Sequence, residues 1–445
     1  MPPRRTDRLL RLARTVHRAG RGLGADLTLY AVSAAYAAFT ALYSTLPAHR
    51  TWGTIALPAY LVLALVALVQ LLLRRGSGTR VRMGVVFVGW AGTTLLPLIV
   101  EAAARAGGAL GKAQDEVEVV EMAGARLVDT GTPYLSHEGI AAALPSLGYL
   151  AYVPYNPGIA VFGLPRRYFG DAWWTDARVG FAVVTGAALI AALCLLRQLT
   201  GGPVLVRAAQ VVTVLPVCAL TLATGGDDMP VLALSLLALA FAARALATDG
   251  RPALYWWLAA GLVAGDTAAM KMFALPVLVI IGVLLFVHVR GAFGWYVVPA
   301  IAVPAATLLP VILRNPDAVV ENLIRYPMGN GLAESPAASN FPGHLLAVLV
   351  PQGSTLAAGL LAATALLFVV HLVARPPATA GSASWRAGVA LLLAILIAPA
   401  SRFGYLLYPA AYAVWAVALT TRLGRFGDSG ADTAQLPVAT RTQPA

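Results

Sequence analysis

The segment TIALPAYLVLALVALVQLLL, residues 54–73, decides the fold class. It has no charged side chain, and a helix of about 20 apolar residues crosses the ~30 Å hydrocarbon core of a bilayer. The next segment, RRGSGTRVR at 74–82, is rich in Arg. Arg clustered next to a span is typical of its cytoplasmic side. Together the two segments predict a membrane-spanning helix whose C-terminal end lies in the cytoplasm.

Apolar segments of this kind recur along the chain. Its 445 residues are 59% hydrophobic and 12% charged, whereas a soluble domain is about a quarter charged. A membrane β-barrel would show alternating segments of about ten residues instead. We therefore predict an all-α polytopic membrane protein with about twelve transmembrane helices, at 26–46, 54–73, 83–104, 179–197, 204–223, 229–247, 253–265, 272–289, 295–313, 354–374, 387–400 and 405–421.

The net charge of +12 comes mainly from Arg in short loops and at the N-terminus, with Lys only at 112 and 271. This distribution predicts a plasma-membrane protein with positive-inside topology and argues against a nucleic-acid surface. Both termini are then cytoplasmic, and the two long loops are extracytoplasmic. Cys194 and Cys218 lie inside apolar runs, so we expect small core residues and no disulfide.

The predicted organisation has seven parts. They are a basic cytoplasmic N-terminus (1–24), N-terminal spans (25–104), an extracytoplasmic loop with an acidic motif (105–178), further spans (179–313), a second extracytoplasmic loop (314–353), C-terminal spans (354–421) and a disordered cytoplasmic tail (422–445).

The first long loop contains AQDEVEVVEMAG at 113–124, in a chain with only 20 acidic residues. Apolar side chains recur there at helical spacing, with Glu118 and Glu121 on the other face, which predicts an amphipathic helix on the membrane surface. Asp115 and Glu116 begin this helix, where acidic residues stabilise the helix dipole. A carboxylate at a lipid–water boundary can instead serve as a general base. The sequence leaves both interpretations open.

Aromatic residues follow in the same loop, between residues 151 and 180. Trp and Tyr favour the membrane interface, so anchoring explains them without any ligand. The alternative is a platform for sugar rings or a lipid headgroup, with Tyr152, Tyr155 and Asn156 in contact with substrate.

Three polar groups stand between apolar segments. Lys271 would cost about 2.5–3.5 kcal/mol if buried alone, so it either extends to the interface or binds a phosphate. Arg402 lies on the predicted outer side, where it either pairs with a protein carboxylate or binds a phosphate. Asp227 and Asp228 form a turn, orient the substrate or hold a divalent metal. A metal is the weaker alternative, because no His or further carboxylate is adjacent.

Motifs of several other protein classes are absent. The sequence has no P-loop, no GxGxxG after a strand, no HExxH and no CxxC pair. We therefore expect neither an ATP-driven transporter nor a cytoplasmic nucleotide-sugar transferase, and no cofactor.

In succession these segments resemble the GT-C superfamily of polytopic glycosyltransferases, which use polyprenyl-phosphate sugars. The size resembles the mannosyltransferase-like membrane proteins of actinobacterial envelopes. The resemblance covers roughly residues 85–290 and rests on Asp115-Glu116, Ala123, Leu127, Gly131 and Pro133-Tyr134, then on Pro157, Phe169-Gly170 and Ala177-Arg178, and finally on Gly261, Lys271 and Pro276. Two features depart from it: about three spans precede the acidic loop instead of one, and Val119 replaces a frequent aromatic residue.

The resemblance implies an inverting transfer of mannose, or a related hexose or pentose, to an envelope glycolipid or glycan on the extracytoplasmic side. Asp115 would deprotonate the acceptor hydroxyl and Glu116 would orient the base or the acceptor. Arg402, with Lys271 and Arg178, would stabilise the leaving lipid phosphate.

Two other functions fit the same residues. A transporter or flippase of a lipid-linked sugar would bind the phosphate without chemistry, but such proteins often contain two repeated halves, and the sequence shows none. A non-catalytic envelope protein could also retain this fold.

Overall fold

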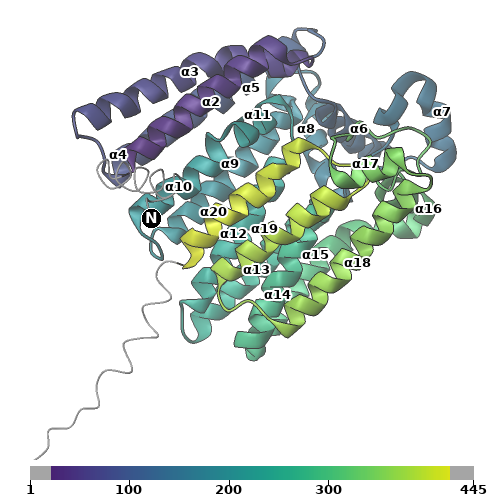
Figure 1. The fold of residues 1–445 in the computed structure, drawn as a ribbon. Coiled ribbons are helices and arrows are strands. Elements are labelled where there is room, and N and C mark those ends of the chain that lie inside the picture. The colour runs from purple at the N-terminus through teal and green to yellow at the C-terminus, as the bar shows by residue number, and fades with distance from the viewer. Residues whose placement is uncertain (1–21, 421–445) are drawn as a thin grey trace, which may run out of the picture.

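The computed structural model describes residues 22–420, which form helices joined by mostly short connections (Figure 1). Within this part of the chain the single β-type pairing is an isolated bridge between Ala338 and Ser401. The predictions for the tail at 422–445, and for all but the last residues of the N-terminal part, lie outside the described residues.

Nine helices in residues 22–420 are long and apolar enough to cross a membrane. They agree with the prediction of an all-α, multi-pass membrane protein. They are α2 (Leu23–Tyr43), α3 (Pro47–Leu72), the continuous α4 (Thr79–Trp90), η1 (Ala91–Leu95) and α5 (Leu96–Ala106), α9 (Ala177–Leu196), α12 (Asp228–Leu246), α15 (Phe293–Arg314) with its preceding turn η6 (Arg290–Ala292), α18 (Gly353–Ala374), α19 (Ala380–Ile397), and α20 (Leu407–Thr420) with its preceding turn η8 (Phe403–Leu406).

The remaining predicted spans also correspond to helices. The pair α10 (Gly202–Thr213) and α11 (Pro216–Thr224) bends by 42° and makes a tenth span if it is counted as one. The helix α14 (Leu275–His288), preceded by η5 (Met272–Ala274), is apolar but shorter, and α13 (Arg251–Met270) is not among the nine. Twelve spans therefore stay a prediction.

The helix α12 forms the centre of the bundle (Figure 1), with 83% of its apolar window buried against 11% for α18. Its surface is mostly Ala and Leu, which lets neighbouring helices pack closely. Small residues serve the same purpose between α13 and α15. A Cβ on Gly261 would lie 2.3 Å from the carbonyl oxygen of Tyr296, and one on Gly265 would lie 2.7 Å from that of Pro299. Close packing therefore explains Gly261.

The hairpin of α2 and α3 packs on one side of the bundle, against the continuous α4–η1–α5 helix (Figure 1). That helix contains Pro97, which has no N–H to donate to the carbonyl of Thr93 four residues earlier. The indole Nε1 of Trp52 in α3 donates to this carbonyl instead, at 2.8 Å. A backbone carbonyl that loses its helical hydrogen bond inside a membrane needs another donor. The Trp52 bond supplies this donor and fixes the hairpin to the bundle.

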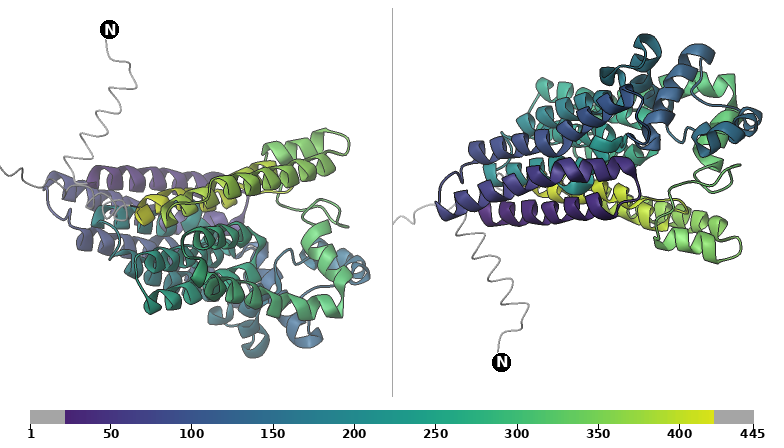
Figure 2. Two further views of the ribbon diagram at one scale, coloured as in Figure 1. Left: turned by 90° about the horizontal axis from the view of Figure 1, so that it is seen from below. Right: turned by 90° about the horizontal axis from the view of Figure 1, so that it is seen from above.

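The two long connections lie at the same end of the bundle (Figures 1 and 2). The first contains α6 (Asp115–Thr130), α7 (His137–Leu147), η2 (Gly148–Ala151), η3 (Pro157–Gly163), α8 (Leu164–Phe169) and η4 (Trp173–Thr175), and the second contains α16 (Pro316–Val320), η7 (Glu321–Arg325) and α17 (Pro342–Leu349). They contact each other directly, since Val153 N donates to Asn322 Oδ1 at 2.9 Å and the Tyr152 hydroxyl donates to Glu321 Oε1 at 3.0 Å.

Local predictions have mixed outcomes. The helix expected after residue 114 is confirmed: α6 begins at Asp115 and ends before Gly131, which has a φ of 74°. The expectation of a solvated polar face is wrong for Glu121, because its side chain is buried and forms ion pairs inside the protein. Cys218 is buried as expected, whereas Cys194 is exposed, because it lies on the outer face of α9.

Candidate active site

The start of α6 is fixed against the bundle. The backbone N–H of Gln114 donates to the carbonyl of Thr224 at the end of α11, at 2.8 Å. Further along, a Cβ on Gly124 would lie 2.6 Å from the backbone carbon of Gly163, so α6 crosses η3 with no intervening side chain. These contacts hold Asp115 and Glu116, the first two residues of α6, in a defined position.

Two cavities meet at this position. The α19 cavity, of about 360 Å³, is lined by Lys271, by Leu361 of α18 and by Leu391 and Ile395 of α19, among others. The α2 cavity, of about 740 Å³, is lined by residues of α2, the start of α3 and α11. Six residues line both cavities, and we call them the partition: Asp115, Glu116, Tyr149, Pro336, Arg402 and Tyr405.

The carboxylates of the partition have different partners. Asp115 Oδ2 accepts a hydrogen bond from the Tyr149 hydroxyl at 2.5 Å. Burial and this hydrogen bond raise the pKa of Tyr149 to about 12, so the phenol stays protonated at neutral pH and donates. Glu116 pairs through Oε1 with Arg402, and its buried Oε2 has no partner. No Arg or Lys pairs with Asp115 within residues 22–420.

Lys271 lies in the wall of the α19 cavity. Its Nζ is 2.7 Å from Asp227 Oδ1 and 2.6 Å from Asp228 Oδ1, and it lies 4.9 Å from the centre of the Tyr155 ring. Burial raises the pKa of Asp227 to about 6, although the Lys271 ammonium opposes this effect. Two carboxylates already neutralise Lys271, so Arg402, with one carboxylate and a 31% exposed side chain, is the more available cation.

The predicted substrate-contacting residues separate into two groups. Tyr152 and Tyr155 line the α19 cavity, and Asp228 lines the α2 cavity. Asn156 and Asp227 are buried and line neither cavity. The Asn156 amide donates to the Ala268 carbonyl at 2.7 Å, so it ties the first long connection to α13.

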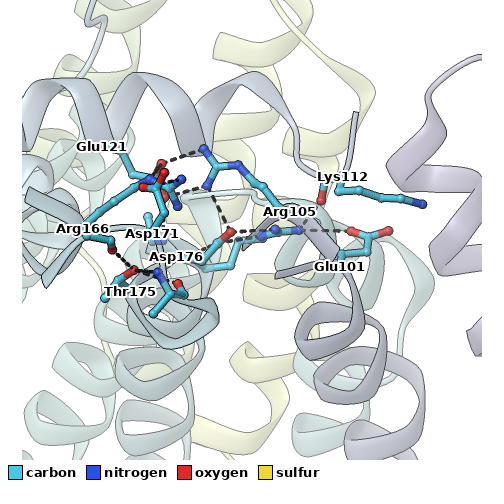
Figure 3. A network of polar contacts seen from close by, with 12 residues as sticks. Glu101, Arg105, Lys112, Glu121, Arg166, Asp171, Thr175 and Asp176 are labelled. Atoms are coloured by element: carbon cyan, nitrogen blue, oxygen red, sulfur yellow. Dashed lines mark hydrogen bonds and ion pairs between the residues drawn. The ribbon is translucent and has the colours of Figure 1, made fainter. Parts of the chain in front are cut away.

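Arg178 lies elsewhere, in a buried ionic cluster with Asp176 and Glu101. Figure 3 shows this network, in which Glu101, Arg105, Glu121, Arg166 and Asp176 are labelled. The Arg178 guanidinium bonds to Asp176 at 2.8 Å and to Glu101 at 3.1 Å. Arg105 forms a bidentate pair with Glu121, at 2.9 and 2.7 Å. Arg166 pairs with the same carboxylate, Glu121, at 3.2 Å. We call these six residues the Arg178 cluster: Glu101, Arg105, Glu121, Arg166, Asp176 and Arg178.

This placement corrects the grouping of Arg178 with Arg402 and Lys271. The Arg178 side chain is fully buried and lines neither cavity. The Arg178 guanidinium is paired with buried carboxylates, because burying it alone in a helix bundle would cost several kcal/mol. Arg178 joins α5 to the start of α9, and the pair of Arg105 with Glu121 extends the cluster to α6.

Several residues of the site are not predicted from the sequence. Tyr149 and Tyr405 belong to the partition, and Glu321 in the second long connection binds the Tyr152 hydroxyl. The one usable signal is the spacing of Tyr149, Tyr152 and Tyr155, which extends the aromatic segment by one step of three residues. Glu321 has no such signal, since its partner lies 169 residues away.

The site has no cluster suited to a metal ion: within residues 22–420 no three or more His, Cys, Asp and Glu side chains gather closely enough. Fold and site together define an α-helical, multi-pass membrane protein whose polar side chains converge at one end of the bundle. Comparisons with protein-family models, curated proteins and solved structures find no match.

Proposed function

We propose that this protein is a glycosyltransferase that moves a sugar from a polyprenyl-phosphate donor to an acceptor hydroxyl. The observation that carries the proposal is the partition, where an Asp115 carboxylate without a cationic partner and the Arg402 guanidinium lie between two cavities. A transfer reaction needs a base and a site for the leaving anion, with a substrate on either side.

The α19 cavity suits a lipid-linked donor. It shares Pro276, Leu361 and Ala394 with an apolar groove of about 210 Å³ between α14, α18 and α19. An isoprenoid chain in this groove would place its phosphate near Lys271 and Arg402. Because α18 is largely unburied in the protein, the groove lies next to the space that lipid would occupy.

The reaction follows from this arrangement. Asp115 takes the proton of the acceptor hydroxyl, and the oxygen forms a bond to the anomeric carbon of the donor sugar. The bond from that carbon to the phosphate oxygen breaks, with inversion. The polyprenyl phosphate leaves with the bonding electrons, and Arg402 stabilises its charge in a site of low polarity.

The first experiment uses full-length protein in lipid nanodiscs. Transfer of radiolabelled sugar from polyprenyl-phosphate mannose to a membrane lipid extract is compared between wild type and Asp115→Asn. We expect the variant to lose about 10²- to 10⁴-fold in rate with unchanged thermal stability, because Asp115 has no ion pair to lose.

Equal rates for the two proteins would remove Asp115 from the role of base. If neither protein transferred sugar from any of a panel of lipid-linked donors, catalysis would be rejected. Reconstituted vesicles would then be assayed for movement of the labelled donor between leaflets, as expected of a flippase.

A further inference from the structure

The α2 cavity identifies the class of acceptor, provided that the proposed transfer holds. It shares Asp115 and Arg402 with the α19 cavity, is otherwise lined by different helices, and has about twice the volume, 740 against 360 Å³. With the donor in the α19 cavity, an acceptor hydroxyl reaches Asp115 through the α2 cavity.

The wall formed by α2 is aromatic and belongs to a membrane-spanning helix. Tyr36, Phe39 and Tyr43 line the cavity, and Phe39 and Tyr43 are 62% and 69% exposed. The rings of Phe39 and Tyr43 are in contact, with centroids 5.0 Å apart. Aromatic side chains near the end of a span favour the membrane interface. The rim of the cavity therefore borders lipid as well as water.

The α2 cavity has hydroxyl-bearing and charged residues within a mainly apolar lining, and its charged residues have an excess of negative charge. The hydroxyl-bearing residues Ser44, Thr221 and Ser339 line it. Its charged lining consists of three carboxylates, Asp115, Glu116 and Asp228, against the single guanidinium of Arg402. This lining suits a neutral headgroup rich in hydroxyls and repels a second phosphate.

We infer that the acceptor is a membrane-anchored lipid with a neutral, hydroxyl-rich headgroup. The headgroup occupies the α2 cavity with one hydroxyl at Asp115, and the apolar chain leaves past Phe39 and Tyr43. Donor and acceptor thus enter from two different sides of the bundle, and the α2–α3 hairpin selects the acceptor.

The test uses two acceptors that differ only in their apolar chain, n-octyl α-D-mannoside and methyl α-D-mannoside, with the matching glucosides in parallel. Full-length protein in nanodiscs receives labelled polyprenyl-phosphate mannose. We expect kcat/KM to be at least about tenfold higher for the octyl glycoside, because its methylenes are buried on binding. The double variant Phe39→Ser/Tyr43→Ser should lose most of this preference, through a larger rise in KM for the octyl than for the methyl glycoside.

Val32→Ser is the matched control, since Val32 is 63% exposed on the same helix and lies outside the cavity. It should retain the wild-type preference. Equal use of octyl and methyl glycosides by the wild type would overturn the inference and leave the transferase proposal intact. An equal loss of kcat/KM with both acceptors in the double variant would also overturn the inference, since α2 would then have only a structural role. No transfer to any acceptor would reject both proposals.

Discussion

The helix α6 contributes to two groups of charged residues, the partition and the Arg178 cluster, whose charges are balanced to different degrees. In the cluster three carboxylates meet three guanidinium groups, and Arg178 is fully buried. In the partition Asp115 has only the Tyr149 hydroxyl, and a cavity lies on either side. Balanced, buried ion pairs hold elements together, whereas a half-buried carboxylate without a cation is free to exchange a proton. The difference separates structural from chemical residues.

The largest effect is expected on stability, when the Arg178 cluster loses its central guanidinium. Arg178→Leu leaves the buried Glu101 without its cation and Asp176 with only Arg105, at 3.2 Å. We therefore expect a loss of about 3–5 kcal/mol in the free energy of unfolding. Tryptophan fluorescence during heating in detergent measures it. Arg167→Leu is the control: its pair with Asp129 is about half exposed and is screened by solvent, so the unfolding midpoint should barely change. Similar midpoints for the two variants would show that the cluster does not hold α6.

Arg402→Gln tests the opposite behaviour in the partition. Sugar transfer should fall by about 10²- to 10³-fold, because the leaving phosphate loses its guanidinium. The free energy of unfolding should fall by less than in Arg178→Leu, because the Arg402 side chain is partly exposed and Gln retains an N–H that can donate to Glu116. A variant that loses stability but keeps its rate per folded molecule would place Arg402 with the structural residues.

The smallest effect should come from Tyr149→Phe, which removes the hydrogen bond to Asp115 and no charge. A hydrogen bond to a charged group contributes about 1.5–3 kcal/mol, so we expect a rate loss of about tenfold or more. An unchanged rate would mean that Tyr149 does not position the base.

The sequence predicts the partition only in part. Asp115, Glu116 and Arg402 stand out because charged residues are rare in this chain and the positive-inside rule disfavours Arg402 on its predicted outer side. Tyr149 and Tyr405 do not stand out, because aromatic residues are common near membrane interfaces. The same rarity argument misleads for Arg178: it identifies a charge that needs a partner and cannot tell a carboxylate of the protein from a phosphate of a substrate.

The sequence by itself determined the all-α, multi-pass class, the two long connections and the start and end of α6. These depend on local periodicity, span length and a terminal glycine, which act within one helix. The tertiary structure alone decided which charges neutralise each other. Lys271 pairs with aspartates 43 and 44 residues away, and Arg402 meets Glu116 over 286 residues. Helix packing sets such distances, and packing depends on the whole bundle.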